Sequence, residues 1–311
     1  MPHELDPELA IALRQAASLG LSVPDYADIR EARRVGTILQ QQWHAHFPDA
    51  REIYPLETHL DGERVPSRVY VPAEDDQRSV VLFIHGGGWS MGDFDGYNPL
   101  MRGIAAACHA PIMFPDYALA PEHPFPRGLG QLREIIRRLN SEQYPQFTGR
   151  RLVVAGDSSG ANMALAALRG SKPFLDADAL VLIYGVFDKN METDSYREFG
   201  GGQFGLSRAG MNAFYRHYTS GDNVAPDDPR LSPLHSDLAG LPPTHITIAG
   251  LDCLRDDSLK LANKLAILGN DVETNHVQGV VHGFLRYGRA VTKSESAIGV
   301  IGDFVRRMGR R

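Results

Sequence analysis

The sequence has few cysteines, no long apolar run and no excess of basic charge. Its 311 residues include only Cys108 and Cys253, which we interpret as small apolar side chains in a reducing compartment. The formal net charge of −6 argues against a surface built to bind nucleic acid. The basic residues at 306–311 are few and are expected to form a solvated tail that complements a helix end.

Signals for export or membrane insertion are also missing from the pattern. The first thirty residues carry scattered acidic and basic side chains instead of a basic stretch followed by an apolar one, so no signal peptide is predicted. No apolar run approaches the length needed to cross a bilayer, so no membrane span is predicted. We therefore expect a cytoplasmic protein.

The chain alternates between apolar runs and helix-like stretches. The later runs are almost continuously apolar, as in parallel strands buried on both faces, whereas the first two alternate as half-exposed edge strands do. Helical stretches between the runs predict a doubly wound α/β sheet. The expected strands are 52–60, 64–71, 79–85, 111–117, 151–156, 179–185, 244–250 and 272–277.

Two segments interrupt this alternation. Residues 1–50 look helical and precede the first strand, while residues 188–225 contain three consecutive glycines and a helix near 208–218. We interpret both as one cap over the edge of the sheet where α/β folds bind ligands. The alternative for the first segment is an N-terminal arm that packs elsewhere. The core would then consist of residues 51–187 and 226–311.

A serine lies between two glycines where an expected strand meets an expected helix. Residues 156–160 read Gly-Asp-Ser-Ser-Gly and fit the pattern G-x-S-x-G. Such a turn is strained and exposes the serine hydroxyl above the sheet, while the helix N-terminus directs positive partial charge at the same place. The pattern predicts Ser158 as a nucleophile, with a purely structural turn as the alternative.

A serine hydroxyl becomes a good nucleophile only when a base removes its proton. His282 follows the last expected strand and is the best placed of the 12 histidines, with a surface-loop histidine as the alternative. Asp252 follows the strand 244–250 and is placed to orient the imidazole. Asp256 is its rival one helical turn further on. Asp256 and Asp257 look like residues that open a helix, where negative charge is favoured.

Three glycines follow the third expected strand, in the run His-Gly-Gly-Gly-Trp at 85–89. Attack on an ester builds negative charge on the carbonyl oxygen. Glycine amides can approach that oxygen without steric hindrance, and the Ser159 amide can join them. The pattern therefore predicts an oxyanion loop, and a simple glycine turn is the alternative.

These motifs together resemble those of the hormone-sensitive-lipase-like esterases. They occur in the order of that family between about residues 80 and 285, and the stretches 184–204 and 231–233 look most similar to bacterial acetyl esterases. The resemblance rests on residues 85–89, 116–126, 156–160, 252–257 and 282–284.

The resemblance implies an α/β-hydrolase fold, with an eight-stranded, mostly parallel sheet, helices on both faces and a helical cap. It implies a pocket for short acyl chains and a reaction that needs no metal or organic cofactor. It also implies a catalytic triad and an oxyanion hole, formed by Ser158, Asp252 and His282 and by the amides of Gly87, Gly88 and Ser159.

Two residues depart from the family pattern. Ser159 stands where alanine is usual, which keeps the amide but adds a hydroxyl that can alter the local hydrogen bonds. Ala118 stands where many members have arginine, which removes an ion pair with Glu122 and leaves the order of that loop open.

Other features have weaker implications. Trp89, Phe94 and Phe204 are expected either to line the substrate pocket or to pack between cap and core. Asp157 is expected to make structural hydrogen bonds. Residues 200–205 match G-x-G-x-x-G but lack a preceding strand, so a cap loop is expected instead of a dinucleotide site. No histidine or cysteine pair has zinc-site spacing.

The sequence therefore predicts a serine carboxylesterase acting on small-molecule, short-chain (acetyl-like) esters, as a monomer or homodimer. An amidase or lactonase with the same triad, or a relative that binds a small ligand without hydrolysing it, are the alternatives.

Overall fold

The centre of the protein is one eight-stranded sheet. The computed structural model describes residues 4–20, 26–60, 62–220 and 224–310. The strands lie in the order β1-β2-β4-β3-β5-β6-β7-β8, and all pairs are parallel except β1–β2 and β2–β4. This confirms the predicted fold class. The strands are β1 (Glu52–Leu60), β2 (Glu63–Val71), β3 (Ser79–Ile84), β4 (Ile112–Pro115), β5 (Arg151–Asp157), β6 (Ala179–Ile183), β7 (Thr244–Leu251) and β8 (Val272–Val281).

The apolar runs account for the centre of the sheet, and the edges differ in part from the prediction. Every residue of β3 and β6 is buried, as expected for strands covered on both faces. β1 is an edge strand as predicted, but β2 lies inside it, paired with β4. β8 is the other edge, and its residues 274–278 alternate between exposed and half-buried.

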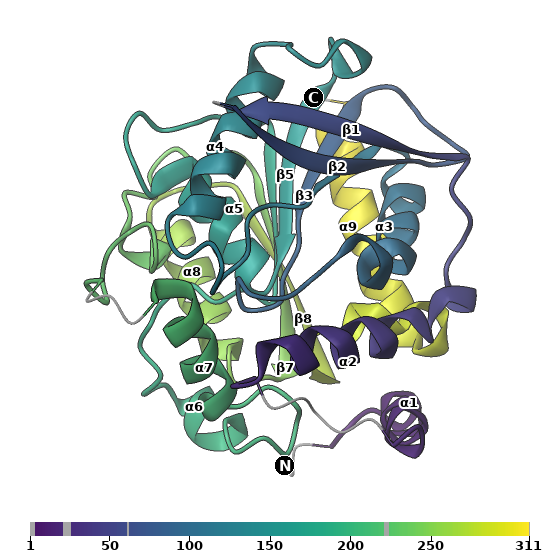
Figure 1. Ribbon diagram of the computed structural model, residues 1–311, viewed down its shortest axis with the longest axis vertical. Coiled ribbons are helices and arrows are strands. Elements are labelled where there is room, and N and C mark those ends of the chain that lie inside the picture. Colours follow the sequence, from purple (N-terminus) through teal and green to yellow (C-terminus); the bar gives the residue numbers. More distant parts are fainter. Residues whose placement is uncertain (1–3, 21–25, 61, 221–223, 311) are drawn as a thin grey trace.

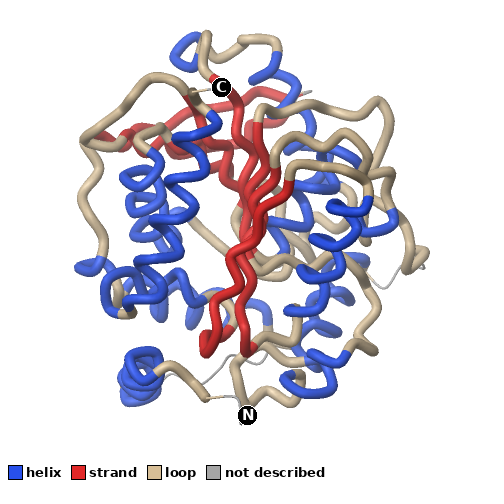
Figure 2. Tube along the Cα trace, turned by 180° about the vertical axis from the view of Figure 1, so that it is seen from behind, coloured by secondary structure: helices blue, strands red, loops and turns tan. Residues whose placement is uncertain are grey.

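Helices cover both faces of this sheet (Figures 1 and 2). α3 (Phe94–Cys108) and α9 (Thr292–Met308) pack together on one face. α4 (Arg127–Asn140), α5 (Ser159–Arg169) and α8 (Arg255–Ile267) lie on the other. Within the described ranges, every helix is too short or too polar to cross a bilayer. The short 3₁₀ helices are η1 (His44–His46), η2 (Pro145–Phe147), η3 (Pro233–His235) and η4 (Phe284–Ala290).

Four further helices gather at the lower end of the molecule in Figure 1, beyond the sheet. They come from the two segments that interrupt the alternation: α1 (Pro7–Ser18), α2 (Ile29–Gln41), α6 (Asp194–Phe199) and α7 (Arg208–Thr219). The two segments touch each other, because the Tyr26 ring lies 4.5 Å from that of Phe214 and the Tyr26 carbonyl oxygen lies 2.9 Å from His217 Nε2. Residues 1–3 and 21–25 of the first segment and 221–223 of the second lie outside the described residues.

Candidate active site

The predicted nucleophile occupies a strained turn. β5 ends one residue before Ser158 and α5 begins one residue after it. Ser158 has φ 55° and ψ −122°, a backbone conformation that residues other than glycine rarely adopt. A Cβ on Gly156 would collide with the backbone of Gly160, and a Cβ on Gly160 would collide with carbonyl oxygens at the end of β3. The two glycines therefore make the tight crossing of the chain possible.

A chain of hydrogen bonds joins the three residues predicted as a triad. His282 Nε2 lies 2.9 Å from Ser158 Oγ, and His282 Nδ1 lies 2.6 Å from Asp252 Oδ2. Asp252 is buried, and its Oδ1 accepts a hydrogen bond from the Leu254 amide at 3.0 Å. His282 directly follows β8 and Asp252 directly follows β7, so two parallel strands end at the same place. This geometry can pass a proton from the serine hydroxyl to a held imidazole.

The rival acids make other contacts. Asp256 Oδ2 accepts a hydrogen bond from the Ser195 amide at 2.8 Å, at the start of α6. Asp257 is wholly buried, and its Oδ2 accepts hydrogen bonds from the amides of Phe187 and Asp188 at 2.9 and 3.2 Å. Burial raises the pKa of Asp257 to about 7. Both acids lie in the first turn of α8, as predicted, and neither bonds to the imidazole.

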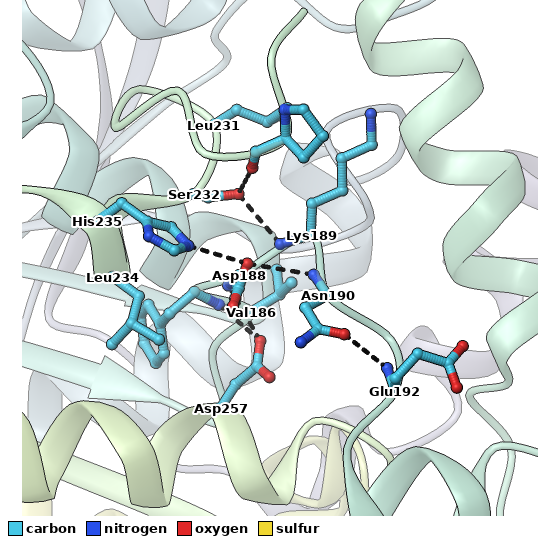
Figure 3. A network of polar contacts seen from close by, with 12 residues as sticks. Val186, Asp188, Lys189, Asn190, Glu192, Leu231, Ser232, Leu234, His235 and Asp257 are labelled. Carbon is cyan, nitrogen blue, oxygen red and sulfur yellow. Dashed lines mark hydrogen bonds and ion pairs between the residues drawn. The ribbon is translucent and has the colours of Figure 1, made fainter.

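Asp257, in helix α8, belongs to a polar network with residues 186–235, which lie between β6 and β7 along the chain (Figure 3). Asp188 Oδ1 lies 3.3 Å from His235 Nε2, and the Lys189 amide donates to Ser232 Oγ at 3.0 Å. Ser232 Oγ in turn donates to the Pro226 carbonyl oxygen. The network thus ties the start of the inserted segment to the residues just after it. Sequence reasoning missed it, since its members are spread along the chain.

The glycine loop and the start of α5 present backbone amides beside Ser158. Gly87 and Gly88 have φ 114° and 60°, which suits residues without a side chain. A Cβ on Gly88 would also overlap the Phe214 ring. In the described part of the chain, the amides of Gly87 and Gly88 have no hydrogen-bond acceptor. The Ser159 amide is the first in α5 and has no partner within the helix. These amides are therefore free to bind an anionic oxygen.

Asp157 holds the glycine loop in place. Its Oδ1 accepts hydrogen bonds from the Gly86 amide at 2.8 Å and from the Tyr97 hydroxyl at 3.1 Å, and its Oδ2 accepts one from the Tyr184 hydroxyl at 3.3 Å. Burial raises the pKa of Asp157, and the hydrogen bond from Gly86 opposes that shift. The structural hydrogen bonds expected of Asp157 are present. The two tyrosines were missed, although Tyr184 directly follows β6, a position that points to the site.

The hydroxyl of Ser159 has a specific partner. Its Oγ accepts a hydrogen bond from the Trp89 amide at 3.1 Å, which joins the start of α5 to the far end of the glycine loop. An alanine at this position would leave the Trp89 amide without that acceptor. The departure from the family pattern at Ser159 therefore adds a bond between the two parts of the site that carry the amides.

A cavity of about 490 Å³ opens beside Ser158 and His282. Its wall is mostly apolar, and most of its apolar side chains come from residues 5–43 and from the inserted segment. Residues 202–206, which overlap the cap loop expected at 200–205, take part in this wall. Apolar side chains that line the cavity include those of Leu13, Leu39, Phe204, Met211 and Phe214.

Of the three aromatic residues suggested for the pocket, only Phe204 lines this cavity. Trp89 is buried, and its ring stacks on that of Tyr218 at 4.6 Å between centroids. Phe94 packs against the Phe114 ring and beneath the guanidinium of Arg68. The pocket interpretation was therefore wrong for Trp89 and Phe94, because both side chains point into packing between elements.

The loop that follows β4 obtains its ion pair from a different element. Glu122 binds both Nη atoms of Arg33 on α2, at 2.8 and 2.7 Å. Arg33 also donates to the carbonyl oxygens of Ser90 and Ala120, at 2.8 and 3.0 Å. The hydrogen bonds from Arg33 to its carboxylate lower the pKa of Glu122 to about 2. Arg33 thus supplies the charge that Ala118 lacks.

In the described ranges, no group of three or more histidine, cysteine, aspartate or glutamate side chains is arranged to hold a metal ion. The stretch at 200–205 follows helix α6 and not a strand, so it lacks the setting of a dinucleotide site.

Comparisons with known proteins agree with this architecture. Residues 81–286 match the family model described as an α/β-hydrolase fold. The carboxylesterase NlhH of Mycobacterium tuberculosis is 33% identical over 246 residues, which cover 76% of each chain. The ethyl acetate hydrolase of Pseudomonas putida is 30% identical over 312 residues, which cover 94% of this chain and 96% of that one.

Among solved structures, the ester hydrolase EH1AB1 from the metagenome of Lake Arreo superposes with a TM-score of 0.88 at 26% identity, covering 98% of both chains. The fold, the family model and the curated relatives all indicate an ester hydrolase with the α/β-hydrolase fold. The chain belongs to the α/β-hydrolase family and is a carboxylic ester hydrolase.

Proposed function

We propose that the protein hydrolyses short-chain, acetyl-like esters through an acyl-enzyme on Ser158. The observation that carries this proposal is the continuous hydrogen-bonded chain from Ser158 through His282 to the buried Asp252, beside a mostly apolar cavity. Ser158 is the nucleophile, His282 the general base and acid, and Asp252 the group that orients the imidazole and stabilises its charged form.

The reaction has two halves. Ser158 Oγ attacks the ester carbonyl carbon while its proton passes to His282 Nε2, and the amides of Gly87, Gly88 and Ser159 stabilise the negative oxygen. His282 then gives that proton to the departing alcohol. In the second half, water attacks the carbonyl carbon of the acyl-enzyme and loses a proton to His282. His282 gives this proton to Ser158 Oγ as the bond between Oγ and the acyl carbon breaks and the acid is released.

The cap accounts for substrate size. Residues 1–50 and 188–225 act as one cap over a core made of 51–187 and 226–311, and the cap supplies most of the apolar wall. Short acyl chains are supported by the likeness to the ethyl acetate hydrolase, which aligns along almost the whole chain.

Replacing Ser158 tests this proposal. Ser158→Ala should abolish release of p-nitrophenol from its acetate ester and labelling by an organophosphate, while the circular dichroism spectrum stays that of the wild type. Ser159→Ala, which keeps its amide, serves as the matched variant and should still be labelled. Across a series from acetate to dodecanoate, wild-type kcat/KM should be highest for the short esters. Turnover by the Ser158→Ala variant, or a preference for dodecanoate, would contradict the proposal.

A further inference from the structure

A cationic side chain lies in the cavity wall beside the proposed base. Arg286 is four residues after His282, in η4, and lines the cavity together with Ser158. Its Nε donates to the Gly283 carbonyl oxygen at 2.8 Å. A Cβ on Gly283 would collide with Arg286 Nη2. The guanidinium therefore occupies the space left by the missing side chain next to His282, and Gly283, at φ 72°, has the freedom to allow it.

Most of the hydrogen-bonding capacity of Arg286 is unused. A guanidinium has five N–H groups, and the bond to Gly283 uses one of them. In the described part of the chain, no carboxylate lies within ion-pair distance of Arg286. Asp157, the acidic side chain in the same wall, already accepts hydrogen bonds from Gly86, Tyr97 and Tyr184. The positive charge is thus held in a mostly apolar wall without a bonded counter-ion.

A charged group in such surroundings favours a ligand of opposite charge. Removing a guanidinium from water is costly unless an anion compensates it, and the planar fork of arginine fits the two oxygens of a carboxylate. One guanidinium close to Asp157 suits a ligand with a single negative charge better than a dianion. The rest of the wall, including Leu39 and Phe204, suits a short methylene chain.

We infer that the preferred esters carry an ionised carboxylate in addition to the ester group. Arg286 binds this carboxylate while Ser158 attacks the ester carbonyl. Half-esters of short dicarboxylic acids and acyl esters of short hydroxy acids both have this chemistry. This inference rests on the proposed function and adds a substrate class to it. Arg286 is the residue that sets the specificity.

Pairs of esters that differ only in charge test the inference with the wild-type protein. Monoethyl succinate is compared with ethyl succinamate, and 4-acetoxybutanoate with 4-acetoxybutanamide, so that the charge lies once on the acyl side and once on the alcohol side. At least one anionic ester should have a kcat/KM about 10- to 100-fold higher than its amide. Equal or lower values in both pairs would overturn the role of Arg286. No hydrolysis of any of the four would overturn the assignment to short esters as well.

Variants then identify the responsible side chain. Arg286→Gln should bring the ratio of anionic to neutral ester close to one, and Arg286→Lys should retain part of it because the charge remains without the fork. Both rates come from one protein preparation, so the ratio does not depend on the fraction of folded enzyme. Arg289→Gln is the matched control, since Arg289 is exposed and pairs with Glu295. A wild-type ratio in Arg286→Gln would overturn the inference.

Discussion

Ser158 is held in a conformation that most side chains avoid, and its surroundings explain why it persists. Within this turn, Ser158 is the residue with positive φ, and it lies between a buried strand and a buried helix that are both fixed by packing. Asp157, the residue before it, anchors the glycine loop through Gly86. Two neighbouring residues therefore fix the proposed nucleophile and the proposed oxyanion hole together.

At the residue scale we predict that Asp157→Asn weakens both stability and catalysis. The amide loses the charge that strengthens the hydrogen bonds from Gly86 and the two tyrosines, and so the free energy of unfolding should fall by about 1–3 kcal/mol. Displacement of the glycine loop should lower kcat more than it raises KM. Urea unfolding and steady-state kinetics measure the two effects. Asp194→Asn, on the exposed side of α6, is the control, and wild-type kcat in Asp157→Asn would refute the anchoring role.

The triad candidates could be found in the sequence because each directly follows a strand. Ser158, Asp252 and His282 come after β5, β7 and β8, and the carboxyl ends of parallel strands meet at one edge. The structure brings all three within hydrogen-bond distance, while their catalytic roles stay a prediction. The directions of Trp89 and Phe94 could not be found in this way, since an apolar side chain packs wherever its tertiary neighbours leave room.

At the scale of elements, helix α2 is fastened to the loops that frame the site. Arg33 reaches the carbonyl oxygen of Ser90, just after the glycine loop, and Glu122 in the loop after β4. No local sequence signal announces this contact, because its partners lie 57 and 89 residues away along the chain. The wall that α2 contributes to the cavity depends on it.

We predict that Arg33→Gln loosens this wall. The loss of hydrogen bonds to Ser90, Ala120 and Glu122 should lower the free energy of unfolding by about 1–2 kcal/mol and raise KM for short esters several-fold. Arg34→Gln removes the next arginine, whose exposed pair with Glu31 contributes little, and is the control. Steady-state kinetics measures KM, and urea unfolding measures the free energy of unfolding, for both variants. An effect of equal size in the two variants would argue against the contact.

At the scale of the whole molecule, the buried acid Asp257 couples folding to pH. Its pKa is raised to about 7 by burial, so the folded protein keeps a proton that the unfolded chain releases near pH 4. The folded state therefore binds more protons between these values, and this contribution to stability is lost as the pH rises from about 4 to about 7. The network of Figure 3 places this acid beneath the start of the inserted segment.

We predict that Asp257→Asn removes this pH dependence. The difference in unfolding free energy between wild type and variant should change in favour of the variant by about 2–4 kcal/mol from pH 4 to pH 7.5. Urea unfolding across that range measures it. Asp256→Asn changes the neighbouring, partly exposed acid and should follow the wild-type curve. If the unfolding free energy of Asp257→Asn depends on pH as that of the wild type does, then Asp257 does not hold a proton in the folded protein near neutral pH.

The walls of the cavity and the reacting groups come from separate stretches of chain. Most of the wall belongs to residues 5–43 and 202–214, while Ser158, Asp252 and His282 follow the ends of sheet strands. Substitutions in the wall can consequently change which molecules enter without shifting the atoms that react. During evolution, substitutions in the wall can therefore change substrate preference while the residues that carry out hydrolysis are retained.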